Sequence, residues 1–311
     1  MTPKRILLLG ATGTIGRATA RALVARGYEL VCLVRAGEVP GATVRIGDVS
    51  DPESVARDGI CGERFDALIS CLASRTGVPD DAWAIDHSAQ LHALTAAKAT
   101  GIPHFVLLSA ICVQKPMLAF QHAKLAFEAA LIASGLRYTI VRPTAFFKSL
   151  SGQVDRVMRG KPYLMFGDGR LTACKPIGDD DLGRYIADCV EDEGCWNHVL
   201  PIGGPGPAIT PLQQGEALFA LLGRRPHYRC VPVRLLDAII AVLNALRLRE
   251  KAELARIGRY YATESMLVLD RESGRYDAAA TPSTGSETLF DYYAQLVAGE
   301  AEAERGDHAV F

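Results

Sequence analysis

The chain has 311 residues, of which 49% are hydrophobic and 22% are charged, and its formal net charge is −1. This composition indicates a globular chain with ample material for a core, and the balanced charge without a Lys/Arg block argues against a nucleic-acid partner. The eight cysteines are scattered without C-x-x-C spacing, so we expect reduced thiols and no zinc site, iron–sulfur cluster or other metal site.

The amino terminus passes from Met-Thr-Pro-Lys-Arg directly into an apolar stretch. It lacks the hydrophobic segment and small-residue cleavage site that are typical of a secretory signal. We therefore expect the protein in the cytoplasm.

Residues 6–16 read Ile-Leu-Leu-Leu-Gly-Ala-Thr-Gly-Thr-Ile-Gly, and an amphipathic run follows over residues 17–26. This pattern predicts a strand buried on both faces, a tight turn and a helix. Gly10 permits the turn, Gly13 lets the backbone approach a pyrophosphate, and Gly16 allows the helix to pack closely on the strand. The free N–H groups and the positive end of the helix would then bind the phosphates of a dinucleotide.

The next segments alternate between strand and helix patterns, which is the context that such a glycine motif requires. Further strands are expected over residues 28–35, 42–48, 66–70, 104–109 and 137–142, and a helix is expected over residues 83–100. We predict an α/β protein with a Rossmann-type, doubly wound parallel sheet. The NADP-binding domain would span residues 1–145, and a smaller substrate-binding region over residues 146–311 would be partly interleaved with the sheet.

The glycine spacing is G-x-x-G-x-x-G, which resembles the extended and atypical branches of the short-chain dehydrogenase/reductase superfamily. The second strand ends in Val34-Arg35 and carries no acidic residue there. An acid at this place would accept from a ribose 2′-hydroxyl, whereas an arginine suits a 2′-phosphate, so Arg35 favours NADPH over NADH. Asp48, after the third strand, either faces the adenine, as is common in that superfamily, or caps a helix after Ser50.

The cofactor should lie along the glycine turn and the carboxyl ends of the parallel strands. The expected cofactor contacts are Gly10, Thr12, Gly13, Thr14, Ile15, Gly16, Arg35, Asp48, Val49, Cys71, Leu72, Ala73, Lys124 and Pro143.

In the superfamily that the chain resembles, a Ser after the fifth strand and a Tyr-x-x-x-Lys on the next helix form the catalytic set. Here Ser109 and Lys124 are present, but the tyrosine position is Phe120. The resemblance implies that Lys124 holds the nicotinamide ribose. Without the phenol, interconversion of alcohol and ketone loses its usual proton donor, so the departure favours hydride delivery to a carbon whose charge is delocalised elsewhere.

Seven longer runs carry a more specific resemblance: His104-Phe-Val-Leu-Leu-Ser-Ala-Ile-Cys-Val-Gln-Lys-Pro116, Val141-Arg-Pro-Thr-Ala-Phe-Phe-Lys-Ser149, Phe166-Gly-Asp-Gly169, Ala173-Cys-Lys-Pro176, Val199-Leu-Pro-Ile-Gly-Gly-Pro205, Ile257-Gly-Arg-Tyr-Tyr-Ala262 and Glu264-Ser-Met-Leu-Val-Leu-Asp270. With Phe-Gln-x-Ala-Lys124, they resemble the NADPH-dependent 8-vinyl reductases of chlorophyll and bacteriochlorophyll synthesis, which are of NmrA and isoflavone-reductase type. The resemblance implies an oxidoreductase acting on 3,8-divinyl chlorophyllide a or divinyl protochlorophyllide a. An unrelated type uses flavin and iron–sulfur clusters, and the absence of cysteine clusters argues against that type.

Reduction of a vinyl group conjugated to a tetrapyrrole forms no alkoxide, which agrees with Phe120. The proton would come from water or from Tyr163, Lys148 or Lys161, among which the sequence does not choose. A planar apolar substrate needs an aromatic cleft, and a propionate needs a cation. The expected substrate contacts are Phe120, Arg142, Phe146, Phe147, Lys148 and Phe166.

Some of these residues have an equal structural interpretation. Phe146 and Phe147 would suit the core as well as a cleft, and Arg142 could instead pair with a carboxylate of the protein.

The carboxy-terminal region carries three further helix signals, over residues 179–191, 211–222 and 233–248. The last of them is strongly apolar but shorter than the roughly 20 residues that span a bilayer. We expect it to be a packed helix or a lid, with weak contact to a membrane surface as the alternative.

Two other functions remain open from the sequence. An NADP-binding, NmrA-like redox sensor without catalysis would also suit the missing tyrosine, and a reductase of another conjugated alkene would suit the retained lysine. The long runs quoted above favour the 8-vinyl reductase over both.

Overall fold

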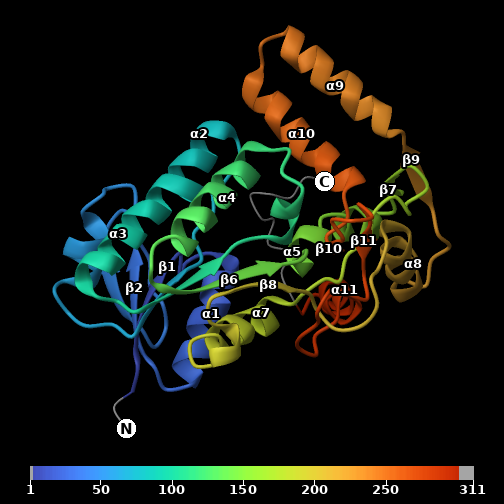
Figure 1. Cartoon of the computed structure of the whole chain (residues 1–311). Helices are drawn as coiled ribbons and strands as arrows, with labels where there is room; N and C mark the ends of the chain where they lie inside the picture. Colours follow the sequence, from blue (N-terminus) through green and yellow to red (C-terminus); the bar gives the residue numbers. More distant parts are fainter. Residues whose placement is uncertain (1–2, 301–311) are drawn as a thin grey trace.

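The computed structural model describes residues 3–300 and is built around a seven-stranded parallel sheet (Figure 1). The strand order is β3-β2-β1-β4-β5-β6-β8, and every neighbouring pair is parallel. The strands are β1 Arg5–Leu9, β2 Glu29–Val34, β3 Thr43–Ile46, β4 Ala67–Ser70, β5 His104–Leu108, β6 Arg137–Pro143 and β8 His198–Ile202. The predicted Rossmann-type sheet is confirmed.

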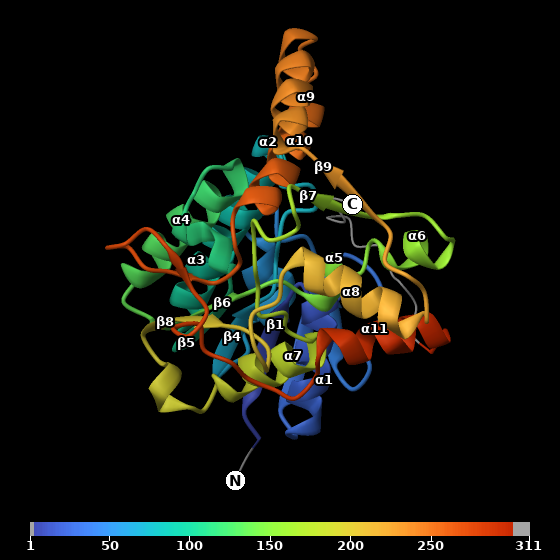
Figure 2. The same ribbon diagram turned by 90° about the vertical axis from the view of Figure 1, so that its right-hand side faces the viewer.

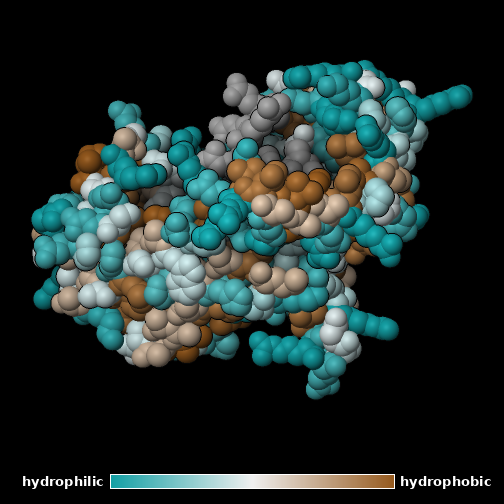
Figure 3. Space-filling model, turned by 90° about the horizontal axis from the view of Figure 1, so that it is seen from above, coloured by the Kyte–Doolittle hydropathy of each residue, from teal (hydrophilic) through white to brown (hydrophobic). Residues whose placement is uncertain are grey.

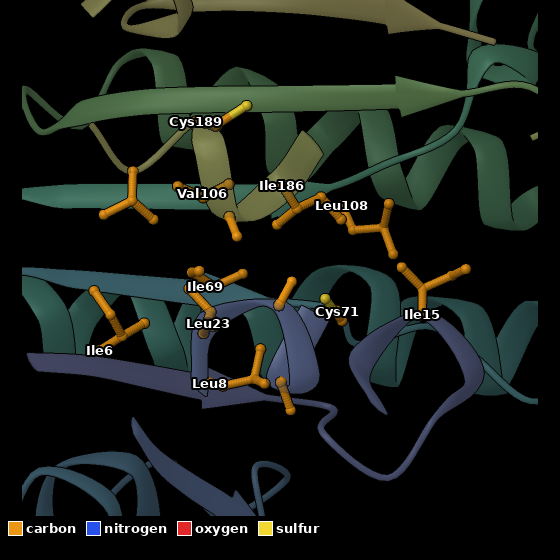
Figure 4. Close-up of a cluster of buried hydrophobic side chains, with 14 of the residues drawn as sticks. Ile6, Leu8, Ile15, Leu23, Ile69, Cys71, Val106, Leu108, Ile186 and Cys189 are labelled. Carbon is orange, nitrogen blue, oxygen red and sulfur yellow. The ribbon is translucent and has the colours of Figure 1, made fainter. Parts of the chain in front are cut away.

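Alternate residues of the central strands enter two different cores, because successive side chains of a strand point to opposite faces. In β1, Ile6 and Leu8 belong to one cluster, whereas Leu7 and Leu9 belong to the other. Figure 4 shows the first cluster, in which side chains of three strands meet those of the helices on that face. Burial on both faces explains why these strands read as continuous apolar runs.

Helices cover both faces of the sheet. On the face of Ile6 lie α1 (Thr14–Ala25) and α7 (Asp179–Asp188), which approach so closely that a Cβ on Gly183 would stand 2.6 Å from the backbone of Ala18. The other face is covered by η1 Val55–Ile60, α2 Pro79–Ala82, η2 Trp83–Ala89, α3 Gln90–Thr100 and α4 Ala119–Ile132.

The helix expected over residues 83–100 is present, but it is not uniform. It begins earlier, at Pro79, and its middle part, Trp83–Ala89, is π-helical. Gly101 ends it in the left-handed conformation, with φ of 74°. π-Helical turns are rare and frequently lie at functional sites.

The second half of the chain builds a smaller core beyond the carboxyl ends of the strands, although β8 and α7 belong to the large sheet layer. The elements outside the sheet layer are η3 Ile111–Gln114, α5 Phe147–Leu150, α6 Val154–Met158, β7 Tyr163–Phe166, α8 Pro211–Leu221, β9 Tyr228–Val231, α9 Val233–Ala245, α10 Arg249–Thr263, β10 Val268–Leu269, β11 Tyr276–Asp277 and α11 Leu289–Ala298. The short helix η4 Glu193–Cys195 precedes β8, and its Cys195 belongs to the core of the sheet layer. The domain boundary between residues 145 and 146 stays a prediction.

All three carboxy-terminal helices that the sequence predicts are present. The helix expected over residues 179–191 is α7, although it ends at Asp188. The helix expected over residues 211–222 is α8, where Thr210 and Gln213 form a capping box ahead of Pro211.

Of the roles expected for the helix over residues 233–248, packing in a core is wrong, and the roles of lid and of membrane contact stay predictions. This helix is α9, and none of its thirteen residues, all of them described, is buried. With α10 it forms a hairpin that projects from the body of the molecule (Figures 1 and 2). Among residues 3–300, no helix is long and apolar enough to cross a membrane.

Buried His104 makes stability depend on pH. The Thr139 hydroxyl donates to the carbonyl of Cys195, so its oxygen accepts from Nε2–H of the neutral His104 at 3.1 Å. Burial lowers the pKa of His104 to about 4.

Since the unfolded chain takes up a proton near pH 6.5, the free energy of unfolding should fall as pH drops from about 6.5 to 4, by roughly 3 kcal/mol in total. Urea unfolding of wild type and His104→Gln across this pH range measures how much of the loss is due to His104. An equal pH slope in both proteins would assign the loss to other groups.

Candidate active site

The turn after β1 has the geometry that the three glycines predicted. Gly10 has φ of 75°, and a Cβ on Gly16 would stand 2.0 Å from the Gly10 carbonyl oxygen, so neither position accepts a side chain. Gly13 differs, because its φ of −74° is ordinary and its Cβ would meet only that oxygen, at 3.4 Å. Within residues 3–300, no contact requires glycine at position 13, so the missing side chain leaves room for a ligand.

Helix α1 begins at this turn with its first N–H groups free of a side-chain cap and with no acid in its first turn. Such a helix end attracts an anion, because unpaired N–H groups and the helix dipole both favour negative charge. The turn and the helix end therefore fit the pyrophosphate of a dinucleotide.

A cleft of about 610 Å³ runs from this turn along the carboxyl ends of the strands. Twelve of the fourteen predicted cofactor residues line it: Gly10, Thr12, Gly13, Thr14, Ile15, Gly16, Arg35, Asp48, Val49, Cys71, Leu72 and Ala73. Lys124 and Pro143 are not in its lining. We call this cavity the cofactor cleft.

Three arginines line the cofactor cleft. Arg35 follows β2, whereas Arg17 on α1 and Arg75 after β4 were not predicted as contacts. The alternative role of Asp48 as a helix cap is wrong, because η1 begins at Val55. Asp48 instead accepts from the backbone N–H of Ser50 at 2.9 Å and faces the cleft.

Lys124 is held by a carboxylate that the sequence analysis missed. Its Nζ donates to Oδ1 of Asp86 at 2.8 Å, and the same oxygen accepts from the backbone N–H of Ser74 at 3.2 Å. The Asp86 side chain is completely buried, and its Oδ2 has no partner among the described residues. Because Ser74 lines the cofactor cleft, this contact connects Lys124 to the wall of the cleft.

Asp86 lies in the π-helical segment η2, and α4, which carries Lys124, packs against it. The only signal in the sequence was an acid beside Ile85 on a helix that had to bury one face. That signal does not identify a partner 38 positions away.

Ser109, Arg142 and Phe120 line neither the cofactor cleft nor the second cavity described below. Ser109 donates to buried Glu128, which also forms an ion pair with Arg142. The structure thus gives Arg142 the structural pairing that the sequence left as an alternative. Phe120 is 9% exposed, packs in the smaller core and stands beside Gly77.

A second cavity, of about 310 Å³ and mainly apolar, lies between β7, the residues after β6 and the end of α10. Four predicted residues line this apolar cavity: Pro143, Phe146, Tyr163 and Phe166. Phe147 is buried and its ring lies 5.7 Å from that of Tyr292, so it belongs to the core. Cys112 and Glu264 also line the cavity and were not predicted as contacts.

The two cavities share Phe146 and Ser149, so they meet at the start of α5. A ligand in the apolar cavity can therefore reach a cofactor in the neighbouring cleft. Phe146, whose role was left open, lies at this junction.

The three proton sources left open by the sequence differ in their surroundings. Lys148 lines the cofactor cleft, and its Nζ donates to the Thr14 hydroxyl at 3.2 Å. Tyr163 lines the apolar cavity, where burial raises the pKa of its phenol and the hydroxyl donates to Gln214. Lys161 is exposed and is in the lining of neither cavity.

Comparison with known proteins agrees with this geometry. A family model described as NAD(P)H-binding matches residues 10–193. The chloroplastic divinyl chlorophyllide a 8-vinyl-reductase of Oryza sativa subsp. indica is 48% identical over 98% of this chain and 82% of its own length. The chain belongs to this reductase family. Its members of the same name in Cucumis sativus and Arabidopsis thaliana are 48% and 47% identical, over 98% and 97% of this chain and 79% of their own lengths.

Solved structures support the fold of this reductase family member. The NADPH-dependent quinone oxidoreductase QOR2 of Escherichia coli, in complex with NADPH, aligns with a TM-score of 0.71 at 19% identity, over 94% of this chain and 99% of that one. The enzyme WbmH of Bordetella bronchiseptica, in complex with NAD⁺, aligns with a TM-score of 0.62 at 20% identity, over 74% and 85%. The chain is an NAD(P)H-binding protein of Rossmann type.

Substitutions of Gly13 and Gly16 distinguish a glycine that is required for ligand binding from one that is required for packing within the protein. Gly13→Ala should leave the free energy of unfolding within about 0.5 kcal/mol of wild type, yet raise the Kd for NADPH by about tenfold, because its methyl group enters the cleft. Gly16→Ala should destabilise the fold by about 1–3 kcal/mol, because its Cβ overlaps the Gly10 carbonyl oxygen. Thermal unfolding and quenching of protein fluorescence by NADPH measure both effects. Equal destabilisation by the two variants would contradict this assignment.

Proposed function

We propose that the chain reduces the 8-vinyl group of 3,8-divinyl chlorophyllide a, or of divinyl protochlorophyllide a, to an ethyl group with NADPH. The observation that carries this proposal is the identity of nearly half of all positions with reductases of that name, over almost the whole chain. The meeting of a dinucleotide cleft with an apolar cavity supports it.

The chemistry fits the side chains at the junction. When bound, the nicotinamide of NADPH supplies a hydride. The protein must then orient the vinyl group, exclude water and deliver a proton to the other carbon of the double bond. Apolar walls around Phe146 and Phe166 suit a planar macrocycle, over which the negative charge of the intermediate is spread. No alkoxide is formed, so phenylalanine at position 120 is compatible with the reaction.

Lys148 is the proton donor that we favour among the three candidates. It lies in the cofactor cleft next to Ser149, which lines both cavities. Nearby Asp179 has its pKa raised to about 6 by burial, while the charge of Lys148 acts in the opposite direction. A carboxyl group with this pKa can exchange protons near neutral pH, so it could restore the proton that Lys148 gives up.

The preference for NADPH rests on Arg35, which follows β2 and lines the cleft. Arg35→Ala should raise the KM for NADPH by about tenfold or more, because an arginine pairs with a phosphate by charge-assisted hydrogen bonds worth about 1.5–3 kcal/mol. The KM for NADH should change little. Steady-state kinetics with both cofactors test this, and an equal effect on the two would remove Arg35 from 2′-phosphate recognition.

Expression of the chain in a photosynthetic strain that lacks 8-vinyl reductase tests the proposed function in a cell. Conversion of the accumulated divinyl pigment to monovinyl pigment is expected. If the pigment stays divinyl while the protein accumulates, the non-catalytic sensor becomes the better account. The relatives' names place them in chloroplasts, whereas the cytoplasmic location of this chain stays a prediction.

A further inference from the structure

Helices α9 and α10 form an arm that stands away from the rest of the molecule (Figure 2). Two polar contacts fix them to each other. Arg259 on α10 pairs with Asp237 on α9, and Arg256 donates to the side-chain oxygen of Asn244 at 3.0 Å. The arm is therefore a defined hairpin.

One face of α9 is apolar and exposed. Leu235, Ile239, Val242 and Leu246 are spaced by four, three and four positions, which places them in one row on the helix. They are 50%, 39%, 57% and 63% exposed, respectively. We call these four residues the α9 stripe. Leu236, Ile240 and Leu243, by contrast, are partly buried.

Basic residues lie at both ends of the stripe, where Arg234 precedes Leu235 and Arg247 follows Leu246. The arm, residues 233–263, contains six Lys/Arg and three Asp/Glu, which gives it a net charge of +3 in a chain whose total is −1. Arg247, Arg249 and Lys251 lie at the tip, where α9 turns into α10. Seen from above, a hydrophobic band with hydrophilic side chains beside it occupies the part of the view where Figure 1 places the arm (Figure 3).

The base of the arm, where the chain enters α9 and leaves α10, lies at the apolar cavity. Val231 lies two residues before α9, Tyr261 and Ala262 are in the last turn of α10, and all three line that cavity. The base of the arm is thus part of the cavity wall.

We propose that the arm is a docking surface for an anionic lipid bilayer, with the α9 stripe in the boundary between head groups and acyl chains. The basic tip would then contact acidic lipid head groups. An exposed apolar row flanked by Lys and Arg is the pattern of helices that lie in a membrane interface.

The size of the stripe favours a bilayer over a second copy of the chain. A helix of thirteen residues is about 20 Å long and about 10 Å wide. One face of it covers only a few hundred Å², below the roughly 800 Å² per partner of a stable protein interface. A bilayer, unlike a protein partner, needs no surface of complementary shape. Binding of the arm to a bilayer does not depend on the proposed reaction.

Flotation of the full-length protein with lipid vesicles tests the proposal. We expect it to bind vesicles that contain about one third phosphatidylglycerol, to bind less as salt rises, and to bind pure phosphatidylcholine weakly. Leu235→Glu with Val242→Glu should weaken binding by at least about tenfold. The matched control is Ile132→Glu with Leu221→Glu, because those residues are 45% and 42% exposed on other helices. The control should bind like wild type.

A second pair of charge changes checks the role of the tip. Arg247→Glu with Arg249→Glu should reduce binding to anionic vesicles and remove its salt dependence. NADPH should quench the fluorescence of every variant as it does that of wild type, because none of the substituted residues lines the cofactor cleft. Equal binding by the stripe variant and the control would overturn the proposal. So would a dimer in analytical ultracentrifugation that the stripe variant dissociates, without vesicle binding by wild type, because the stripe would then be a protein interface.

Discussion

Replacing Lys124 by methionine is expected to lower kcat by about 100-fold or more. The lysine is fixed by Asp86, which also accepts from the backbone of Ser74 in the wall of the cofactor cleft. If the Nζ of Lys124 positions the ribose of NADPH, its loss allows the reacting carbon to move, and a displacement of about 1 Å costs about 100-fold in rate.

The same substitution leaves the Asp86 carboxylate buried without a cation, which by itself destabilises a fold by about 3–5 kcal/mol. The double variant Lys124→Met with Asp86→Asn separates the two effects, because it removes the charge as well. We expect it to recover most of the lost thermal stability and to remain slow. Recovery of turnover together with stability would show that Lys124 acts only in folding.

Lys148→Met is expected to reduce kcat by about 100-fold or more when NADPH is saturating. General acid catalysis by a placed side chain contributes about 100- to 10,000-fold, and Lys148 is the candidate that lies in the cofactor cleft. Tyr163→Phe is the matched control, because it removes one hydroxyl from the apolar cavity and keeps the ring. The control should lose no more than a few-fold, since burial raises the pKa of this phenol and makes it a poorer acid.

Single-turnover reduction with NADPH in excess measures the chemical step for both variants. A large loss in Tyr163→Phe together with normal turnover in Lys148→Met would move the proton source to the tyrosine.

The fold and the cofactor cleft were predictable because their signals are local. An apolar strand that is buried on both faces, such as β1, needs no distant information to be recognised, and Gly10 and Gly16 are required by contacts within one turn. The carboxyl ends of parallel strands then meet at one edge, which brings Arg35, Asp48 and Cys71 to one cleft from three different strands.

The errors come from contacts between distant parts of the chain. Asp86 and Lys124 are separated by 38 positions, and only the packing of η2 on α4 brings them together. Arg142 and Phe147 have residue types that suit a pigment cleft, yet Glu128 and Tyr292 occupy them. Sequence pattern gives the chemistry of such a side chain but not its neighbours.

Helix α9 shows that an apolar pattern does not reveal what covers it. Its composition is that of a buried helix, and its only described helical neighbour in close packing is α10. A pattern of apolar residues cannot state whether the surface that covers them belongs to the same chain, to another molecule or to a lipid bilayer.

Anaerobic incubation of the purified protein with 3,8-divinyl chlorophyllide a and NADPH tests the central claim most directly. The proposed function predicts a blue shift of the Soret band and a product heavier by two hydrogens, without added flavin or ferredoxin. If NADPH binds and the pigment is unchanged, the assignment as an 8-vinyl reductase is contradicted, and Phe120 becomes evidence of lost catalysis.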